Sequence, residues 1–490
     1  MRTIGTPSTQ VRKLNAIASG ALPNGDPVVV NADGTVSVVA ETAVSQAIGS
    51  FSVFDAGPVG VHVSSSFDSL NNKVVIAYAD DGNSEYGTAV VGTVSGTSIS
   101  FGTPVVFQNS STAYCAVTFD ETAGKTVICY SDGGAGDQGK AIVGTVSGTS
   151  ISFGSSSVFE SGGANFITSL FESNSDKIVV TYRDTGNGNK GTAVVGTVSG
   201  TSISFGSPVV FYSSQESRLV TATFDSTSNK IAVFYEDNAP SDNRVTGVVG
   251  TVSGTSISFG SPTDSGRETT NDAMSSTFDS LNGKCVVAYR DKGNSNYPSI
   301  MVSTISGTSI SFGSPVVLNS SGTSEPTALV FDGNANKVVA FYFDSSASEG
   351  KLKVGTVSGT GISFGSAVTF SPNSNYLIGP TGATFDSTSN KVVLGYLDTG
   401  DSKGKAVVFQ NSGTAINLTA ENYIGLSSNG YPDTAGATID VQGAINDRQS
   451  GLTAGQAYYV QTDGTLTTTA GDPSVFAGTA ISATKMIVKG

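Results

Sequence analysis

Short apolar runs, separated by turn-forming residues, recur along most of the chain and repeat with a period of about 53 residues. The dipeptide Phe-Asp, once Phe-Glu, marks every copy, and successive copies lie 52, 52, 53, 54, 53 and 54 residues apart. The markers begin at Phe67, Phe119, Phe171, Phe224, Phe278, Phe331 and Phe385. A fixed period of this length indicates an array of supersecondary units, each of which buries its apolar face only against its neighbours.

Each copy predicts four short strands. The first ends at Phe-Asp, the second runs from a Lys to a Tyr-x-Asp triplet, the third has the form TAVVGTVSG, and the fourth reads SISFG and then PVVF. β-Branched residues bounded by Gly, Ser, Asn and Asp are typical of strands. Seven four-stranded units arranged radially predict an all-β fold with a seven-bladed β-propeller. The alternative, an open β-solenoid, does not require a hairpin in every turn.

An acidic residue and a lysine, five positions apart, flank the turn between the first two strands in every copy. A four-residue turn places the two side chains opposite each other, and the pair then fixes the register of the hairpin. When exposed, such an ion pair contributes only about 0.2–1 kcal/mol. The pairs include Asp68 and Lys73, Asp120 and Lys125, Asp225 and Lys230, and Asp386 and Lys391.

The two ends of the array complement each other. The seventh copy ends in a degraded turn at 412–414 (SGT) and lacks the PVVF half of its fourth strand. A matching piece at 51–54 (FSVF) precedes the first copy. We therefore expect the N-terminal piece to complete the last unit and close a ring, which removes the exposed sheet edges of an open array.

The connections within the array fall into two classes. The turns inside the two hairpins of each copy are nearly uniform, whereas the second-to-third loop and the loop between copies differ in every copy. In an antiparallel sheet these two classes lie at opposite ends. Because Tyr and Arg are favoured at recognition surfaces, we expect the variable face to bind a partner, with neutral divergence of loops as the alternative. The expected binding residues are His62, Tyr86, Tyr114, Phe166, Tyr212, Arg218, Arg267, Tyr297 and Tyr376.

Residues 1–49 and 419–490 lie outside the propeller array of 50–418 and share a pattern. The stretch 25–36 (GDPVVVNADGTV) parallels 455–466 (GQAYYVQTDGTL), and each predicts a strand, an Asp-Gly turn and a returning strand. Ile-Gly at 48–49 and at 424–425, and Ala-Gly at 477–478, suggest a further shared element. We therefore predict one small β-domain formed by both chain termini, with the propeller inserted into it.

Composition narrows the function classes. The net charge is −14 and only 13% of the residues are charged, which argues against nucleic acid, because phosphate binding needs a concentrated basic surface. The sequence has no apolar stretch of about 18 residues, and its first residues lack the apolar core of a secretory signal. We therefore expect a protein that is made in a cytoplasm without a signal peptide and does not insert into a membrane.

The three cysteines are expected to be small buried residues. With Asp120 opposite Lys125, Cys115 pairs with Tyr130 across the hairpin. Cys129 then points to the other face, and no disulfide forms.

The sequence predicts no enzyme, no metal site and no cofactor. The one histidine, His62, has no recognisable nucleophile to serve. Acids that follow Tyr-x-Asp do not recur at a fixed spacing, as a calcium site in each copy would require. The Gly-rich stretch 134–141 lacks the Ser or Thr and the helix of a phosphate-binding loop. Paired carboxylates for glycoside hydrolysis remain an alternative.

The C-terminal segment SGLTAGQAYYVQTDGTLTTTAGDPSVFAGTAISATKMIVKG resembles C-terminal segments of structural virion proteins of tailed, particularly marine, bacteriophages. The stretch GTAVVGTVSGTSISFGSPVVF resembles repeats in such proteins. The resemblance implies a virion surface protein of the tail-fibre, head-fibre or decoration type. No catalytic residue is carried over from it.

From this resemblance we expect the terminal β-domain to bind other virion proteins and to form a homo-oligomer. The propeller would attach to a host cell-surface glycan or protein as the receptor. One alternative is a capsid or tail decoration protein with a stabilising role. Another is a secreted glycan-binding or glycan-cleaving propeller.

Overall fold

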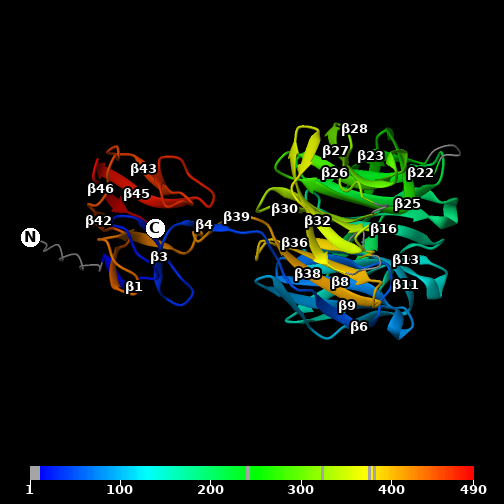
Figure 1. Cartoon of the computed structure of the whole chain (residues 1–490), viewed down its shortest axis with the longest axis horizontal. Coiled ribbons are helices and arrows are strands. Elements are labelled where there is room, and N and C mark those ends of the chain that lie inside the picture. Colours follow the sequence, from blue (N-terminus) through cyan, green and yellow to red (C-terminus); the bar gives the residue numbers. More distant parts are fainter. Residues whose placement is uncertain (1–11, 239–242, 322–324, 373–376, 379–381, 490) are drawn as a thin grey trace, which may run out of the picture. The chain divides into compact units, whose positions relative to one another are not determined.

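The computed structural model describes residues 12–238, 243–321, 325–372, 377–378 and 382–489. The chain divides into two compact units, Gln46–Asn411 and a terminal unit that combines Met1–Ser45 with Ser412–Gly490. Both units consist of β-sheets (Figure 1), which confirms the predicted all-β class. The helices of the described part are single turns of 3-10 helix: η1 (Asp81–Asn83), η2 (Gly133–Ala135), η3 (Thr185–Asn187) and η4 (Lys292–Asn294).

The Gln46–Asn411 unit contains one antiparallel sheet for each repeat, here numbered one to seven along the chain. The strands of a sheet follow one another in chain order, and the fourth strand is split into two halves that both pair with the third. The first, or inner, strands are β7 (Ser64–Asp68), β11 (Val105–Asp120), β16 (Ala164–Glu172), β21 (Ser217–Asp225), β25 (Thr263–Asp279), β30 (Glu325–Asp332) and β36 (Ala383–Asp386), with β35 (Leu377–Ile378) beside β36.

The second strands are β8 (Lys73–Asp80), β12 (Lys125–Asp132), β17 (Lys177–Asp184), β22 (Lys230–Asn238), β26 (Lys284–Asp291), β31 (Lys337–Asp344) and β37 (Lys391–Asp398). The third strands are β9 (Tyr86–Ser95), β13 (Gln138–Ser147), β18 (Lys190–Ser199), β23 (Asn243–Ser253), β27 (Tyr297–Ser306), β32 (Glu349–Ser358) and β38 (Lys403–Gln410).

The first halves of the fourth strands are β10 (Ser98–Phe101), β14 (Ser150–Phe153), β19 (Ser202–Phe205), β24 (Ser256–Phe259), β28 (Ser309–Phe312), β33 (Gly361–Phe364) and β5 (Ala47–Ile48). The second halves are β15 (Ser157–Glu160), β20 (Val209–Tyr212), β29 (Val316–Val317), β34 (Val368–Ser371), β6 (Ser52–Pro58) and the beginnings of β11 and β25. Because β11 and β25 continue into the next inner strand, each of them belongs to two sheets.

The apolar cores lie between successive sheets. The second strands are apolar at nearly every position because neighbouring sheets cover both of their faces. In sheet one, Val74 packs in one cluster with Val393 of sheet seven, whereas Val75 packs in another with Ile128 of sheet two. Five further clusters join the other neighbours in turn. A cavity of about 150 Å³ is lined by inner-strand residues of all the sheets, which therefore follow one another around a shared space.

Residues from the N-terminal side complete sheet seven. Strand β38 pairs with β5 and β6, so that 47–58 supplies both halves of the fourth strand. Across the same junction, the Ser65 hydroxyl of sheet one donates a hydrogen bond of 2.6 Å to the Gly382 carbonyl of sheet seven. The prediction that 51–54 completes the last unit is confirmed.

This pairing also moves the predicted domain boundaries. Ile48, assigned from the sequence to the terminal domain, pairs with Phe409 in sheet seven, so the first boundary follows residue 45 rather than 49. Because 47–58 fills the place of the fourth strand, β39 (Gly413–Ile416) pairs instead with β4 (Glu41–Val44) in the terminal unit. The second boundary therefore follows residue 411 rather than 418.

The hairpin between the first two strands has the predicted register, but its acid and lysine do not form the predicted exposed ion pair. Asp68 lies opposite Lys73, and its buried carboxylate accepts a hydrogen bond of 2.9 Å from the turn amide of Asn71. Several of the lysines bind a threonine on the third strand instead, as Lys230 does to the Thr251 hydroxyl at 3.0 Å. Capping of the turn by a buried acid therefore replaces the ion pair, because an unpaired buried carboxylate is costly.

The same correction applies to the other predicted pairs. Asp120 lies opposite Lys125, Asp225 opposite Lys230 and Asp386 opposite Lys391. The carboxylates that bind the amide three positions on include those of Asp120, Glu172, Asp225, Asp279, Asp332 and Asp386.

A glycine that follows the first half of each fourth strand allows neighbouring sheets to approach closely. A Cβ on Gly102 would lie 1.9 Å from the Thr149 carbonyl oxygen in the Ser-Gly-Thr turn of the next sheet. The equivalent separation is 1.7–2.0 Å at Gly49, Gly154, Gly206, Gly260 and Gly313. Side chains are thus excluded from these positions by the packing of one sheet on the next.

The three cysteines are buried and free, as expected. The predicted pairing of Cys115 with Tyr130 is wrong in detail, because Tyr114 and Cys115 together face Tyr130 in a β-bulge. Cys129 lies opposite Ala116 and packs in a different cluster from Cys115.

The terminal unit contains two five-stranded sheets with matching strand orders, β1-β41-β40-β2-β3 and β42-β46-β45-β43-β44. The first comprises β1 (Lys13–Ile17), β41 (Gly436–Asp440), β40 (Tyr423–Ser427), β2 (Pro27–Val30) and β3 (Val36–Val38). The second comprises β42 (Ile445–Asn446), β46 (Lys485–Val488), β45 (Val475–Ser482), β43 (Ala457–Val460) and β44 (Leu466–Thr467).

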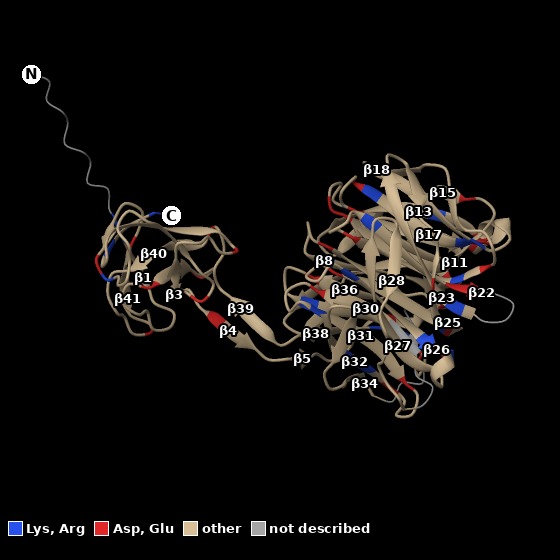
Figure 2. Ribbon diagram, turned by 90° about the horizontal axis from the view of Figure 1, so that it is seen from above, with Lys and Arg blue, Asp and Glu red and all other residues tan. Residues whose placement is uncertain are grey.

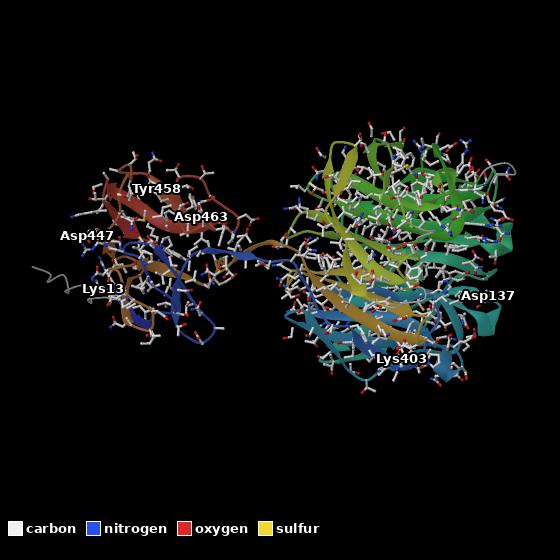
Figure 3. The ribbon with its side chains drawn as sticks, in the orientation of Figure 1. Lys13, Asp137, Lys403, Asp447, Tyr458 and Asp463 are labelled. Carbon is white, nitrogen blue, oxygen red and sulfur yellow. The ribbon has the colours of Figure 1, made fainter. Side chains whose placement is uncertain are left out.

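Equivalent turns in the two terminal sheets have the same geometry. Asp33 and Asp463 each accept a hydrogen bond of 2.9 Å from the amide two positions on, and Gly34 and Gly464 both have φ of 82° (Asp463 is labelled in Figure 3). The terminal unit is therefore an internal duplication, and the Gln46–Asn411 unit is inserted within its first copy.

Charged residues are spread thinly over both units (Figure 2). Among the described residues, no helix has the length and apolar character needed to cross a membrane.

Candidate functional site

The sheets of the Gln46–Asn411 unit have two unlike ends. The hairpin turns lie at one end, the turn end, whereas the variable second-to-third loops and the connections between sheets lie at the other, the loop end. Each inner strand runs from the loop end to the turn end. Residues near the start of an inner strand therefore belong to the loop end.

Three consecutive inner strands carry the same β-bulge near the loop end. In sheets two, three and four, two residues face one buried Tyr of the second strand. The first residue of each bulge is Tyr114, Phe166 or Leu219, with φ of 52°, 51° and 50° respectively. Glycine is the residue that adopts this left-handed conformation without strain, and bulky side chains seldom occur there. Such strain persists where surrounding structure holds it, often at functional sites.

The bulges direct aromatic side chains along the loop end. The His62 ring centroid lies 4.1 Å from that of Tyr114, which lies 5.3 Å from that of Phe166. These residues, here named the aromatic row, come from the connection before β7 of sheet one and from the inner strands of sheets two and three. They lie two residues before Ser64, Ala116 and Thr168, which line the shared cavity. All three rings are half-buried, and Leu219 of sheet four packs against Phe166.

An arginine extends the row. The Arg183 guanidinium, at the end of the second strand of sheet three, lies 5.8 Å from the centre of the Phe166 ring. Its Nε donates a hydrogen bond of 2.9 Å to the Asn189 amide oxygen. Asn189 in turn donates to the Glu216 carboxylate at 3.1 Å. The row therefore ends in a polar group that can bind hydroxyl or carboxylate oxygens.

Glu216 is held by three side chains. Besides Asn189, it accepts hydrogen bonds from Asn238 at 3.1 Å and from Arg218 at 3.3 Å. Burial raises the pKa of its carboxyl group, but the hydrogen bonds from Asn189 and Asn238 and the positive charges of Arg183 and Arg218 together outweigh burial, so the pKa lies below its ordinary value. Glu216 thus stays ionised and anchors the loop that enters sheet four.

Burial shifts the pKa values of His62 and Tyr114 in the aromatic row. It lowers the pKa of His62 to about 4, so that the imidazole is neutral near pH 7. Burial also raises the pKa of Tyr114, while the charge of Arg183 acts in the opposite direction. The row therefore presents uncharged rings beside one half-buried cation.

The structure brings His62, Tyr114 and Phe166 together and places Arg218 beside them through Glu216. The other predicted residues lie elsewhere. Tyr86 and Tyr297 begin the third strands of sheets one and five, Tyr212 stacks on Tyr235, and Arg267 is exposed on β25; Tyr376 lies outside the described residues.

Arg183 and Leu219 were not predicted from the sequence. Leu219 lies five residues before Phe224, just as Tyr114 and Phe166 precede their own Phe markers, so alignment of the copies identifies it. Arg183 is the variable residue of its Tyr-x-Asp triplet. Its significance depends on the ring beneath it, which no alignment of the copies shows.

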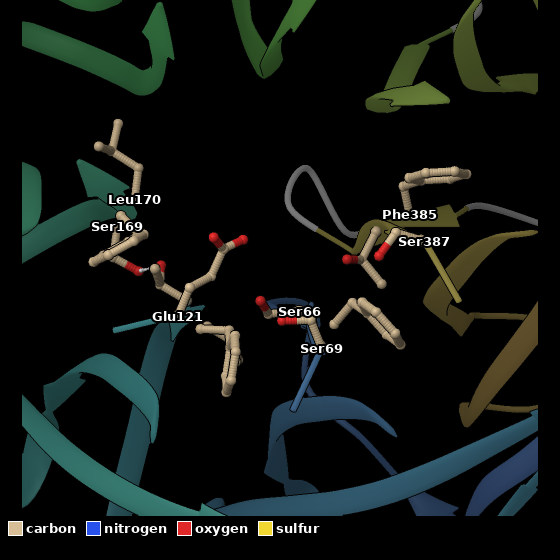
Figure 4. Close-up of a pocket in the computed structure, with 13 residues that line it drawn as sticks. Ser66, Ser69, Glu121, Ser169, Leu170, Phe385 and Ser387 are labelled. Atoms are coloured by element: carbon tan, nitrogen blue, oxygen red, sulfur yellow. Dashed lines mark hydrogen bonds between the residues drawn. The ribbon is translucent and has the colours of Figure 1, made fainter. Parts of the chain in front are cut away.

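A second hollow lies at the turn end (Figure 4). This cavity of about 430 Å³ is lined by inner-strand and turn residues of sheets one, two, three and seven. Figure 4 shows the side chains of Glu121, Ser66 and Ser387 around it. The Thr118 and Ser169 hydroxyls within it bond to each other at 2.6 Å. Because its Phe residues recur in every copy, we attribute it to the repeat itself and place the candidate site at the loop end.

The Tyr-x-Asp triplets have a structural role in turns. Tyr78 and Tyr182 are buried and donate hydrogen bonds to Asp55 at 2.8 Å and Glu160 at 3.1 Å. The Asp184 carboxylate accepts from the Asn187 amide in η3 at 3.0 Å. Among the described residues, no group of three or more His, Cys, Asp or Glu side chains could hold a metal ion.

No family model matches this chain, and no curated protein matches it. Among solved structures, it is similar to a leech intramolecular trans-sialidase complexed with 2,7-anhydro-Neu5Ac, with 9% identity, a TM-score of 0.41, and 74% of this chain and 69% of that chain covered. It is also similar to Sqt1 from Chaetomium thermophilum, with 10% identity, a TM-score of 0.44, and 75% and 100% covered.

A third similar structure is a triple arginine-to-alanine mutant of AofleA from Arthrobotrys oligospora, with 11% identity, a TM-score of 0.38, and 66% of this chain and 87% of that chain covered. At such values these similarities assign no function to this chain. The proposals below therefore depend on its own residues.

Proposed function

We propose that the Gln46–Asn411 unit is a seven-bladed β-propeller that binds a glycan at its loop end. The propeller is supported by the apolar clusters that join successive sheets, including sheet seven to sheet one. It is supported further by the cavity that inner strands of all the sheets line, and by the N-terminal residues that complete sheet seven.

The aromatic row is the observation that carries the binding proposal. Half-buried rings of Tyr114 and Phe166 offer apolar surfaces beside polar atoms of Arg183 and its neighbours. This combination suits a sugar ring, which has an apolar C–H face and a hydroxyl-bearing rim. The left-handed backbone at both residues is unfavourable for folding alone, so a function for these side chains explains why they occupy those positions.

A glycan array probed with the full-length protein tests this proposal. We expect the wild type to bind a restricted group of glycans, and Tyr114→Ala and Phe166→Ala each to weaken binding at least about tenfold. Tyr297→Ala is the matched control, since this half-buried tyrosine lies in sheet five and should leave binding unchanged. Equal binding by all four proteins would refute the placement of the site.

We further propose that the protein binds the glycan without cleaving it. The sole histidine is packed against Tyr114, and burial holds it neutral, so it is engaged in the row rather than poised beside a nucleophile. A reducing-sugar assay on the bound glycan should show no release over the uncatalysed rate. Release that disappears when an acidic residue is replaced would establish a glycosidase instead.

The resemblance to bacteriophage virion proteins leads us to propose that the propeller is displayed on a virion, with the terminal unit as its attachment to other virion proteins. The separate core of the terminal unit supports this division of roles. Antibodies against the propeller should label intact particles and block adsorption to host cells. Particles that carry a variant lacking residues 46–411 and still adsorb normally would indicate a decoration protein.

A further inference from the structure

We propose that the sugar bound at the aromatic row carries a carboxylate, and that Arg183 binds this group. This inference rests on the proposed function and names the class of ligand. It starts from the surroundings of one guanidinium group.

The Arg183 side chain is fixed in place, but its bonding is incomplete. Nε donates to Asn189, and the ring of Phe166 lies beneath the guanidinium. Among the described residues, neither terminal NH₂ group of Arg183 has a hydrogen-bond acceptor, and no carboxylate lies within ion-pair distance. A half-buried guanidinium that keeps two parallel donors unused is suited to a bidentate acceptor.

The nearest negative charge does not meet this need. Glu216 acts on Arg183 electrostatically, yet its oxygens are occupied by Asn189, Asn238 and Arg218. Arg218 adds a second positive charge close to Arg183. The Glu216 carboxylate is thus bonded to three other side chains, and the terminal NH₂ groups of Arg183 are left for a ligand carboxylate.

Sheet five provides a comparison within the same molecule. Arg290 occupies the same place in its Tyr-x-Asp triplet, and its Nε donates to the Asn296 carbonyl at 3.3 Å. The residue five positions before the Phe278 marker is Ala273, so no ring lies at the equivalent bulge position. An arginine at this place is therefore tolerated by the fold, whereas the combination of arginine and aromatic ring occurs at Arg183.

A pair of probes isolates the carboxylate. One is an oligosaccharide that contains glucuronic acid, and the other is the same oligosaccharide with its carboxylates reduced to hydroxymethyl groups. Titration calorimetry on the full chain should show about tenfold or more tighter binding of the acidic probe, weakened by added salt. Arg183→Gln should remove this preference by weakening the binding of the acidic probe far more than that of the reduced probe, and Arg183→Lys should retain only part of it.

Arg290→Gln is the matched control and should keep the full preference. Thermal unfolding of each variant distinguishes a lost contact from a lost fold. Equal binding of the two probes by the wild type, abolished by Tyr114→Ala, would refute the acidic ligand while leaving the binding site in place. Equal binding by Arg183→Gln alone would support the inference. Wild-type binding of neither these probes nor any arrayed glycan would overturn the proposed function together with this inference.

Discussion

Single residues determine the chemistry of the loop end. Tyr114 and Phe166 hold their rings in line only because the backbone at each adopts a left-handed conformation that glycine would favour. His62 completes the row, and its burial against Tyr114 keeps it uncharged. The row is thus a set of uncharged rings. The left-handed backbone at Tyr114 and Phe166 positions two of them, and the neutral imidazole of His62 is the third.

The protonation of His62 should make stability depend on pH. Burial lowers its pKa in the folded protein to about 4, whereas the ordinary value is 6.5. Between these values the unfolded chain binds a proton that the folded protein excludes, so the free energy of unfolding falls as the pH decreases from about 6.5 to about 4. In His62→Gln this contribution is absent.

Urea unfolding of both proteins at several pH values measures the effect. We expect the wild type to lose about 1–2 kcal/mol more than His62→Gln over that interval. Parallel stability curves for the two proteins would show that His62 titrates as an exposed residue does.

At the scale of elements, adjacent sheets fit together through backbone contact as well as apolar side chains. The glycine after each first half-strand abuts a Thr carbonyl of the next sheet. Gly365 is the exception, since a Cβ there would meet only the Val354 carbonyl oxygen at 3.9 Å. The difference arises because 412–414, the corresponding turn of the seventh copy, belongs to the terminal unit.

Gly102→Ala should therefore destabilise the protein, by about 1–3 kcal/mol, because its Cβ would overlap the Thr149 carbonyl and force the sheets apart. Gly365→Ala is the matched control and should change stability by less than about 0.5 kcal/mol. Chemical denaturation compares the two. Equal effects would mean that the approach at Gly102 is readily relieved.

The sequence predicts the elements better than their irregularities. The strands and the register of Asp68 with Lys73 follow from period and turn length, which are local properties. The bulge at Tyr114 does not, because it leaves the repeat length unchanged and depends on packing against the next sheet. The role of Arg183 is not predictable for the same reason, because its contact with Phe166 joins neighbouring strands and residues seventeen positions apart in the chain.

At the scale of the whole molecule, both ends of the repeat array are linked by 47–58. The missing half of the fourth strand in the last copy makes this completion predictable from the sequence. The place of 413–416 is not predictable in the same way, because it depends on which segment pairs with β38. Phe54 packs against Tyr78 and Phe101 of sheet one, with ring centroids 5.0 and 5.9 Å apart. It therefore joins sheet seven to sheet one.

Phe54→Ala should lower the free energy of unfolding by about 3–5 kcal/mol, because it leaves a cavity at this junction. Val53→Ala, whose side chain is 41% exposed, should have a much smaller effect. Calorimetric unfolding of the two variants compares them. Similar losses would indicate that the junction does not depend on Phe54.

The most direct measurement is a crystal structure of the full-length protein with its tightest-binding oligosaccharide. The account predicts a sugar ring in contact with Tyr114 and Phe166 at the loop end, with a polar substituent at Arg183. A sugar bound in the turn-end cavity or on the terminal unit, with the aromatic row empty, would contradict it.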